Sequence, residues 1–167
     1  MNQPPAFHHL LLLLQQSLAE GKETAVLLNS NSMSPLFWAD DHILLVAATS
    51  TQLAPGDIIT LAETGGLVTH RYWGQTADGK LLTRGDRVMH NDPPWPTAAL
   101  VGRVVGRKRS SRMLHFEQGR GKWLAKGVRG LTAVNHTLLT HYPHAVWLRS
   151  VHRLLFGLRW LLTAVVR

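Results

Sequence analysis

The chain has 167 residues, an apolar share of 45% and no cysteine, so it can hold one domain with a core of ordinary size. The lack of cysteine excludes a disulfide framework and a thiolate metal site. Residues 1–100 carry five Lys/Arg against nine Asp/Glu, whereas residues 101–167 carry thirteen against one, and together they give the net charge of +8. This asymmetry predicts either that the C-terminal part meets an anionic surface, lipid or nucleic acid, or that it is a solvated basic tail.

No segment has both the length and the apolarity of a transmembrane helix. The run at 10–14 is five leucines and is too short to span a bilayer. The stretch at 145–166 is long enough, but Arg149, Arg153 and Arg159 interrupt it. Each arginine at mid-bilayer would cost about 2.5–3.5 kcal/mol. With neither an anchor nor an export signal, we expect a cytoplasmic location or a peripheral one at the inner face of the membrane.

The first hundred residues read as a helix followed by short strands. The helix is expected at 7–20 and ends near Gly21. Strands are expected at 25–28, 42–47, 58–62, 67–73, 81–84 and 99–107. Glycine, proline and aspartate residues separate them, as in the turn signal Pro-Gly-Asp at 55–57. This spacing predicts a mainly β core.

The chain changes character after residue 109. Residues 110–130 mix basic residues with glycines and indicate a weakly ordered connecting segment, followed by a short helix at 131–141 and a final helix at 144–166. The expected organisation is therefore an N-terminal helix (1–24), a core (25–109), a basic connecting segment (110–143) and a basic helix (144–167).

The final helix has a mixed pattern. On a helical wheel its basic residues fall within an arc of about 120°, and leucines and valines fill most of the remainder. These basic residues are Arg149, His152, Arg153, Arg159 and Arg167. The pattern predicts either an interfacial amphipathic helix or a helix that packs on the core with its basic face in water. The two interpretations stay open at this point.

The chain also contains the residue types of a serine hydrolase. A serine hydroxyl needs a base within hydrogen-bond reach, and a carboxylate that orients the base improves it. Ser32, His70 and Asp92 can fill these roles, and Asp86 is a second nearby carboxylate. Taken singly, each is more simply explained as a turn residue or as one histidine among ten.

The local context of these residues resembles a known family. Five segments occur in the order found in the signal peptidase superfamily, in the branch of the endoplasmic-reticulum and archaeal enzymes that use histidine as the base. They are Ser-Met-Ser-Pro at 32–35, Pro-Gly-Asp-Ile-Ile at 55–59, His-Arg-Tyr at 70–72, Leu-Thr-Arg-Gly-Asp at 82–86 and Val-Gly-Arg-Val-Val-Gly at 101–106. The resemblance covers residues 29–109, about half of the chain.

The resemblance implies a serine endopeptidase that cleaves a leader, signal or precursor peptide after a small residue. Ser32 would be the nucleophile and His70 the general base, with Asp92 orienting His70 and Asp86 supporting the same network. The Ser32 N–H and the Ser30 hydroxyl would form the oxyanion hole.

Met33 would help to shape the pocket for the small residue. The implied fold is a coiled β-sheet core that needs no cofactor or metal. The sequence departs from the family's pattern at two points. Asn31 stands where the family usually has a small residue, and the N-terminal membrane anchor of the family is missing.

Two other kinds of function stay open. The same fold could be an idle module that binds peptides at an open sheet edge. Alternatively, the core could be a relic in a protein that binds a membrane through 144–166 or binds nucleic acid. Nucleic acid is the less expected partner, because only about 28 residues precede the serine motif, too few for a separate DNA-binding helix-turn-helix.

Overall fold

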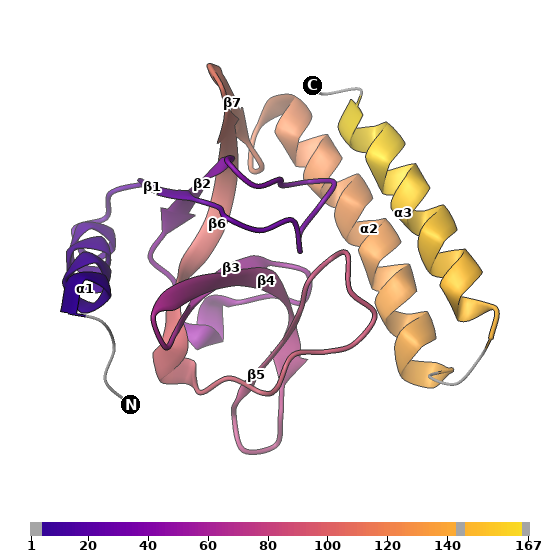
Figure 1. Ribbon diagram of the computed structural model, residues 1–167, viewed down its shortest axis with the longest axis horizontal. Coiled ribbons are helices and arrows are strands. Elements are labelled where there is room, and N and C mark those ends of the chain that lie inside the picture. The colour runs from indigo at the N-terminus through magenta and orange to yellow at the C-terminus, as the bar shows by residue number, and fades with distance from the viewer. Residues whose placement is uncertain (1–4, 143–145, 165–167) are drawn as a thin grey trace.

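The computed structural model describes residues 5–142 and 146–164. Its centre is an antiparallel seven-stranded sheet in the order β1-β2-β6-β3-β4-β5, with β7 paired to β6 (Figure 1). The strands are β1 (Thr24–Leu27), β2 (His42–Val46), β3 (Ile58–Glu63), β4 (Gly66–Gln75), β5 (Leu81–Arg84), β6 (Leu100–Arg109) and β7 (Arg112–His115). The helices are α1 (Pro5–Ala19), α2 (Gly119–His141) and α3 (Leu148–Ala164), with two 3₁₀ turns, η1 (Ser50–Gln52) and η2 (Thr97–Ala99).

The elements predicted up to residue 109 are confirmed to within about three residues at each end. The turns follow local chemistry, since Gly65 and Gly79 supply the positive φ values of 82° and 79° that the β3–β4 and β4–β5 hairpins need. Residues 92–94 lie outside any strand, since Pro93 and Pro94 have no N–H to donate to a sheet.

The main core lies where the coiled sheet meets α1 and α2. Leu14 and Leu18 of α1 and Leu124 and Val128 of α2 pack into one buried cluster with residues of β2, β3 and β6. Met33, Leu36 and Phe37 belong to the same cluster, and each is at most 2% exposed. The loop that carries Ser32 is therefore anchored by its own apolar side chains.

The prediction of a weakly ordered segment at 110–130 is wrong. Ser110 turns the chain with a φ of 53°, β7 pairs with β6, and α2 begins at Gly119. The glycines that suggested a linker allow close packing instead. A Cβ on Gly121 would lie 1.9 Å from the His115 carbonyl oxygen, and one on Gly127 would lie 3.2 Å from Leu162 of α3. With a complete α2, the fold mixes α and β and is not mainly β.

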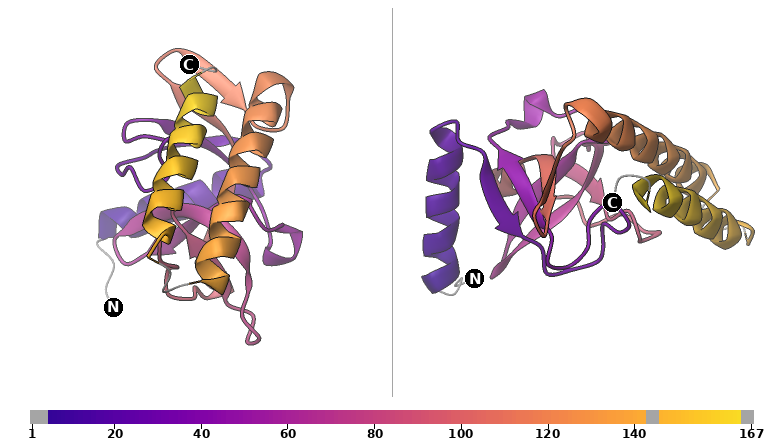
Figure 2. Two further views of the ribbon diagram at one scale, coloured as in Figure 1. Left: turned by 90° about the vertical axis from the view of Figure 1, so that its right-hand side faces the viewer. Right: turned by 90° about the horizontal axis from the view of Figure 1, so that it is seen from above.

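The helices lie at two ends of the molecule. α2 and α3 run side by side as a hairpin at one end of the sheet, and α1 lies at the other end (Figures 1 and 2). Among the described residues, no helix has the length and apolar character needed to cross a bilayer.

α3 confirms a helix within 144–166, although 144–145, 165–166 and Arg167 lie outside the described residues. Its basic residues do not share one solvated face. Arg159 and His152 are buried together with Leu148 and Leu155, whereas Arg149 and Arg153 are exposed. The basic arc of the helical wheel is therefore divided between the interior, where Arg159 and His152 find the polar partners described below, and the solvent.

Candidate active site

Three segments that are distant in the sequence meet at the edge of the sheet. Ser32 lies in the turn region after β1, His70 near the middle of β4, and Asp92 in the loop after β5. The Asp92 loop is fixed to β5 because the Asp92 N–H donates to the Thr83 carbonyl at 2.9 Å. The structure thus brings together the three residues that the sequence singled out for a Ser-His-Asp arrangement.

Hydrogen bonds join the three side chains in a line. His70 Nε2 lies 3.0 Å from Ser32 Oγ, and His70 Nδ1 lies 2.6 Å from Asp92 Oδ2. An ionised carboxylate can only accept, so the proton of the neutral imidazole resides on Nδ1. Nε2 then presents its lone pair to the Ser32 hydroxyl, which is the arrangement in which a histidine can act as a base toward a serine.

Thr83 completes the environment of Asp92. The buried Thr83 hydroxyl donates to Asp92 Oδ2 at 2.5 Å, so this oxygen accepts two hydrogen bonds. Burial opposes the charge on Asp92, but the hydrogen bonds from His70 and Thr83, with the nearby charges of His70 and His90, keep its pKa below the ordinary value. Asp92 is therefore ionised at neutral pH and fixes the orientation of the imidazole.

Two potential hydrogen-bond donors lie beside the Ser32 side chain. The Ser30 hydroxyl is 3.2 Å from Ser32 Oγ. Within the described residues, the Ser32 N–H donates to no backbone carbonyl. The Asn31 side chain accepts from the Ala39 N–H at 2.9 Å and fixes the loop from the other side. The oxyanion hole that the resemblance implies at Ser30 and Ser32 stays a prediction.

The loop after β5 approaches the serine and the histidine closely. The Arg87 N–H donates to the Ser32 carbonyl at 2.9 Å. A Cβ on Gly85 would lie 3.0 Å from the Ser32 carbonyl oxygen and 3.1 Å from His70 Nε2. A side chain at position 85 would crowd the very nitrogen that faces the serine, which explains why a glycine stands there.

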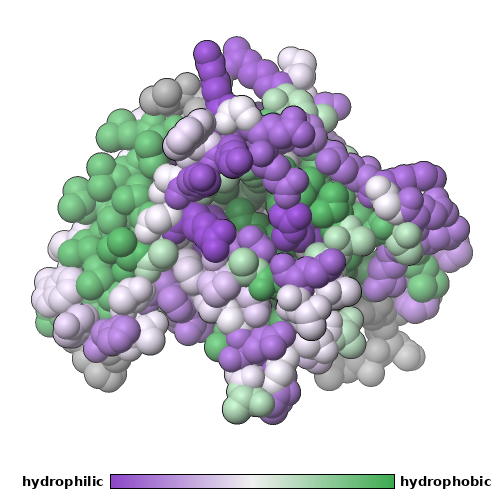
Figure 3. All heavy atoms as spheres, turned by 180° about the vertical axis from the view of Figure 1, so that it is seen from behind, coloured by the Kyte–Doolittle hydropathy of each residue, from purple (hydrophilic) through white to green (hydrophobic). Residues whose placement is uncertain are grey.

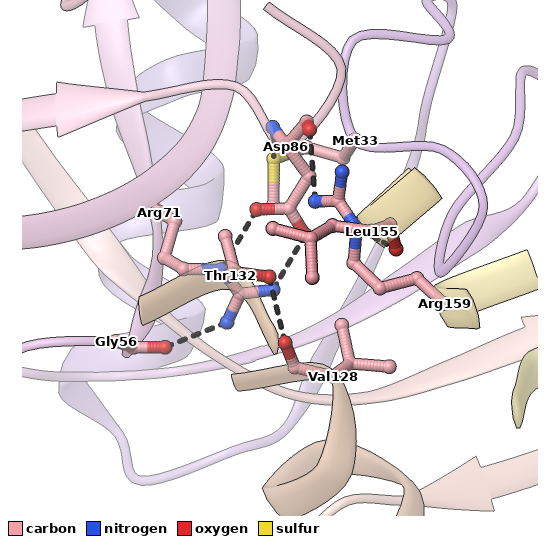
Figure 4. Close-up of polar contacts among 8 residues, drawn as sticks. All are labelled: Met33, Gly56, Arg71, Asp86, Val128, Thr132, Leu155 and Arg159. Atoms are coloured by element: carbon pink, nitrogen blue, oxygen red, sulfur yellow. Dashed lines mark hydrogen bonds and ion pairs between the residues drawn. The ribbon is translucent and has the colours of Figure 1, made fainter. Parts of the chain in front are cut away.

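Asp86 does not lie on the histidine. Both of its carboxylate oxygens accept from Arg71, at 2.8 and 2.6 Å, and Arg71 also donates to the Gly56 carbonyl at 2.7 Å (Figure 4). In the described part of the chain, no hydrogen bond joins Asp86 to His70. Asp86, which we expected to support the same network as Asp92, forms a separate buried ion pair with Arg71 next to the site.

Side chains of α3 contact the loop at Asp86 and Arg87 from the side opposite to Ser32. Arg159 Nη1 donates to the Asp86 carbonyl at 2.9 Å and its Nε to the Leu155 carbonyl at 3.3 Å (Figure 4). His152 hydrogen-bonds Asn135 of α2 at 3.1 Å and interacts with the Arg87 backbone. The buried polar side chains of α3 therefore hold the loop whose other side contacts Ser32.

Positive charge exceeds negative charge around Asp86. The buried guanidinium of Arg84 lies near those of Arg71 and Arg159, with the Asp86 carboxylate among them. Burial, together with repulsion by Arg159 and Arg71, lowers the pKa of Arg84 to about 10, although Asp86 counteracts this. The carboxylate of Asp86 is thus the principal counter-charge of a buried cluster of arginines.

Met33 lies beneath the site and not on its surface. Its side chain is 2% exposed, and its sulfur accepts a weak hydrogen bond from the Asp86 N–H at 3.4 Å (Figure 4). A substrate could not touch it without rearrangement. The expectation that Met33 lines a substrate pocket is not met, and its observed role is to join the serine loop to the Asp86 loop.

Sequence reasoning missed three residues of this region: Thr83, Arg71 and Arg159. Thr83 and Arg71 lie inside the segments 82–86 and 70–72 that carry the resemblance, so their closeness to Asp86 and His70 in the sequence could have indicated a role at the site. No sequence pattern indicates that Arg159 is buried, because an arginine among leucines on a helix is normally solvated.

No family model matches the chain, and a search of the curated proteins gives no match either. Among the described residues, no group of three or more His, Asp or Glu side chains gathers in the way that a metal site needs.

Replacing Asp86 tests whether it is a structural counter-charge. We expect Asp86→Asn to lower the free energy of unfolding by about 3–5 kcal/mol, because it leaves the buried Arg71 without its ionic partner. Guanidinium unfolding followed by tryptophan fluorescence measures the change. Asp78→Asn, which removes an exposed ion pair with Lys80, is the matched control and should have little effect. Equal stability of the two variants would contradict the assignment.

His136 should make stability depend on pH. Its ring stacks on Trp73 with 4.2 Å between centroids, and burial, followed by the charge of Arg84, lowers its pKa to about 4. The unfolded chain takes up the proton at the ordinary pKa of about 6.5. The contribution of neutral His136 to the free energy of unfolding is therefore fully present above pH ~6.5. It is lost as the pH falls toward about 4, and the loss is up to about 3 kcal/mol.

His136→Phe keeps a ring on Trp73 and removes the titration. The free energy of unfolding of this variant should fall less between about pH 7 and pH 4 than that of the unchanged protein. Identical pH profiles for the two proteins would mean that His136 titrates normally in the folded state.

Proposed function

We propose that this chain is a serine endopeptidase with Ser32 as nucleophile, His70 as general base and Asp92 as the group that orients the base. The observation that carries the proposal is the continuous hydrogen-bond line from Ser32 Oγ through His70 to Asp92, with distances of 3.0 and 2.6 Å. The resemblance of segments 32–35, 70–72 and 82–86 to the signal peptidase superfamily is a separate support.

In this mechanism Ser32 Oγ attacks the carbonyl carbon of the scissile peptide bond while His70 Nε2 takes its proton. Asp92 stabilises the imidazolium that forms. The Ser32 N–H and the Ser30 hydroxyl donate to the oxyanion of the tetrahedral intermediate. His70 then gives the proton to the leaving amine, and a water molecule, activated by the same histidine, hydrolyses the ester on Ser32.

A peptide substrate has a groove in which to lie. β1 is an edge strand, and the first half of β4 pairs with β3 on one side only, because β5 pairs with Arg71–Gln75. Residues of β1 and of this part of β4 line one cavity of about 520 Å³. Its lining includes Asn29, three residues before Ser32, and Thr69, the neighbour of His70. The cavity lining therefore comes within three residues of Ser32 and one residue of His70 along the chain.

The chemistry of this groove suggests an extended, apolar peptide segment. Two strand edges with free backbone groups favour a substrate that pairs as an additional strand. The far wall consists of apolar side chains of α1: Phe7, Leu10, Leu11, Leu13 and Leu14. A leader, signal or precursor peptide fits this description, and the resemblance implies a small residue before the cleaved bond.

The second candidate function is a peptide-binding module without catalysis. The same open edges of β1 and β4 favour it, since β-augmentation needs only backbone partners and side-chain pockets. It differs from the first proposal in one respect, which is that the hydroxyl of Ser32 would have no role.

Cleavage of a peptide library decides between the two. Incubation of the full chain with a proteome-derived library, followed by mass spectrometry of new termini, should show cuts after small residues. Ser32→Ala and His70→Ala should each reduce the initial rate by at least about a thousandfold, because each removes a member of a unit that acts together. Ser111→Ala, an exposed serine between β6 and β7, is the matched control and should retain full activity.

Persistent cleavage by Ser32→Ala would show that another group is the nucleophile. Peptides that the unchanged protein retains without cutting, with equal affinity for Ser32→Ala, would establish the binding module instead.

A further inference from the structure

α3 leaves most of its leucines outside the core. Its buried face is formed by Leu148, His152, Leu155, Arg159 and Thr163, so three of the five buried positions are polar. Leu154 and Leu161 are 64% and 58% exposed, and Leu158 and Leu162 are 41% and 38% exposed. Such a run of outward leucines on one helix needs an apolar partner.

α2 extends this apolar surface. A shallow groove between the two helices is lined by Leu131 of α2 and by Leu158, Leu161 and Leu162 of α3. Gly127 and Gly130 of α2 form its floor and raise no side chains that would fill it. Seen from behind, apolar side chains gather at the side of the molecule where the hairpin lies (Figure 3). We call this surface the outer hairpin face; it consists of Gly127, Gly130, Leu131, Leu154, Leu158, Leu161 and Leu162.

The charge around the outer hairpin face has a single sign. The sequence has no Asp or Glu between residues 118 and 167. Six basic side chains of α2 and α3 are exposed: Arg120, Lys122, Lys126, Arg129, Arg149 and Arg153. Trp123 is 76% exposed, and the ammonium group of Lys126 lies 5.6 Å from its ring centroid. Apolar side chains are thus flanked by cations and by an exposed tryptophan.

We propose that the outer hairpin face docks on a phospholipid bilayer that contains anionic headgroups. A helix that lies in the membrane interface combines an apolar strip with flanking lysine and arginine, and tryptophan is favoured at the same depth. The leucines enter the boundary between headgroups and acyl chains, while Lys126, Arg149 and Arg153 meet the headgroup phosphates. This proposal stands independently of the proposed peptidase function.

Two other occupants fit the observations less well. A second copy of the chain would bring two hairpins of the same charge together, with no acidic residue in either hairpin to offset the repulsion. A nucleic acid would satisfy the cations but would leave the leucines in contact with water or phosphate. A lipid surface satisfies both the charge and the apolar side chains.

Vesicle co-sedimentation with the full chain tests the proposal. We expect binding to vesicles of phosphatidylcholine with about one third phosphatidylglycerol, weak binding to phosphatidylcholine alone, and a loss of affinity as salt is raised. The double variant Leu158→Asp, Leu161→Asp should lower the partition coefficient at least about tenfold. Both positions are already exposed, so a change in thermal midpoint is not expected.

The control is Leu12→Asp on α1, where the side chain is 49% exposed at the other end of the molecule and outside the proposed substrate groove. Its binding should equal that of the unchanged protein. A second variant, Arg149→Glu, Arg153→Glu, should lose the preference for phosphatidylglycerol without a change in apolar area.

Four results would overturn the proposal. Absence of vesicle binding by the unchanged protein is one, and equal loss of binding in the α1 control is another. The third is a dimer in light scattering that Leu158→Asp, Leu161→Asp converts to a monomer. The fourth is duplex DNA binding that those substitutions leave unchanged.

Discussion

The buried ion pair between Arg71 and Asp86 connects the parts of the molecule that form the candidate site. Each partner is the sequence neighbour of a residue at the serine: Arg71 follows His70, and Asp86 follows Gly85. Successive residues of a strand point to opposite faces, so β4 directs His70 toward Ser32 and Arg71 toward Asp86. An ion pair on the inner side therefore holds the position of the imidazole on the outer side.

The loop that carries Asp86 also joins the helical hairpin to the candidate site. Arg159 of α3 donates to the Asp86 carbonyl, and the neighbouring Arg87 N–H donates to the Ser32 carbonyl. A desolvated arginine is costly unless its donors are used. Two carbonyls accept from Nε and Nη1 of Arg159, whereas its Nη2 has no hydrogen-bond partner among the described residues. The position of α3 is thereby fixed relative to the loop at the serine, while its leucines remain outside.

The elements that the sequence predicts well are those set by local chemistry. Glycine turns and alternating apolar residues locate β3, β4 and β5, and segments 32–35 and 70–72 locate the serine and the histidine. The first half of α2 was missed because Gly121 and Gly127 normally weaken a helix, and only their contacts with His115 and α3 explain them. The inward direction of Arg159 depends on Asp86, 73 residues earlier, and no local pattern contains that information.

The most direct test of the account is the tautomer of His70 in the folded protein, measured by long-range proton–nitrogen NMR of histidine-labelled chain near neutral pH. The account predicts a proton on Nδ1, strongly deshielded by Asp92, and an unprotonated Nε2. Asp92→Asn should weaken that deshielding and leave the resonances of His136 unchanged. A His70 that carries its proton on Nε2, or that does not respond to Asp92→Asn, would contradict the role of His70 as the base for Ser32.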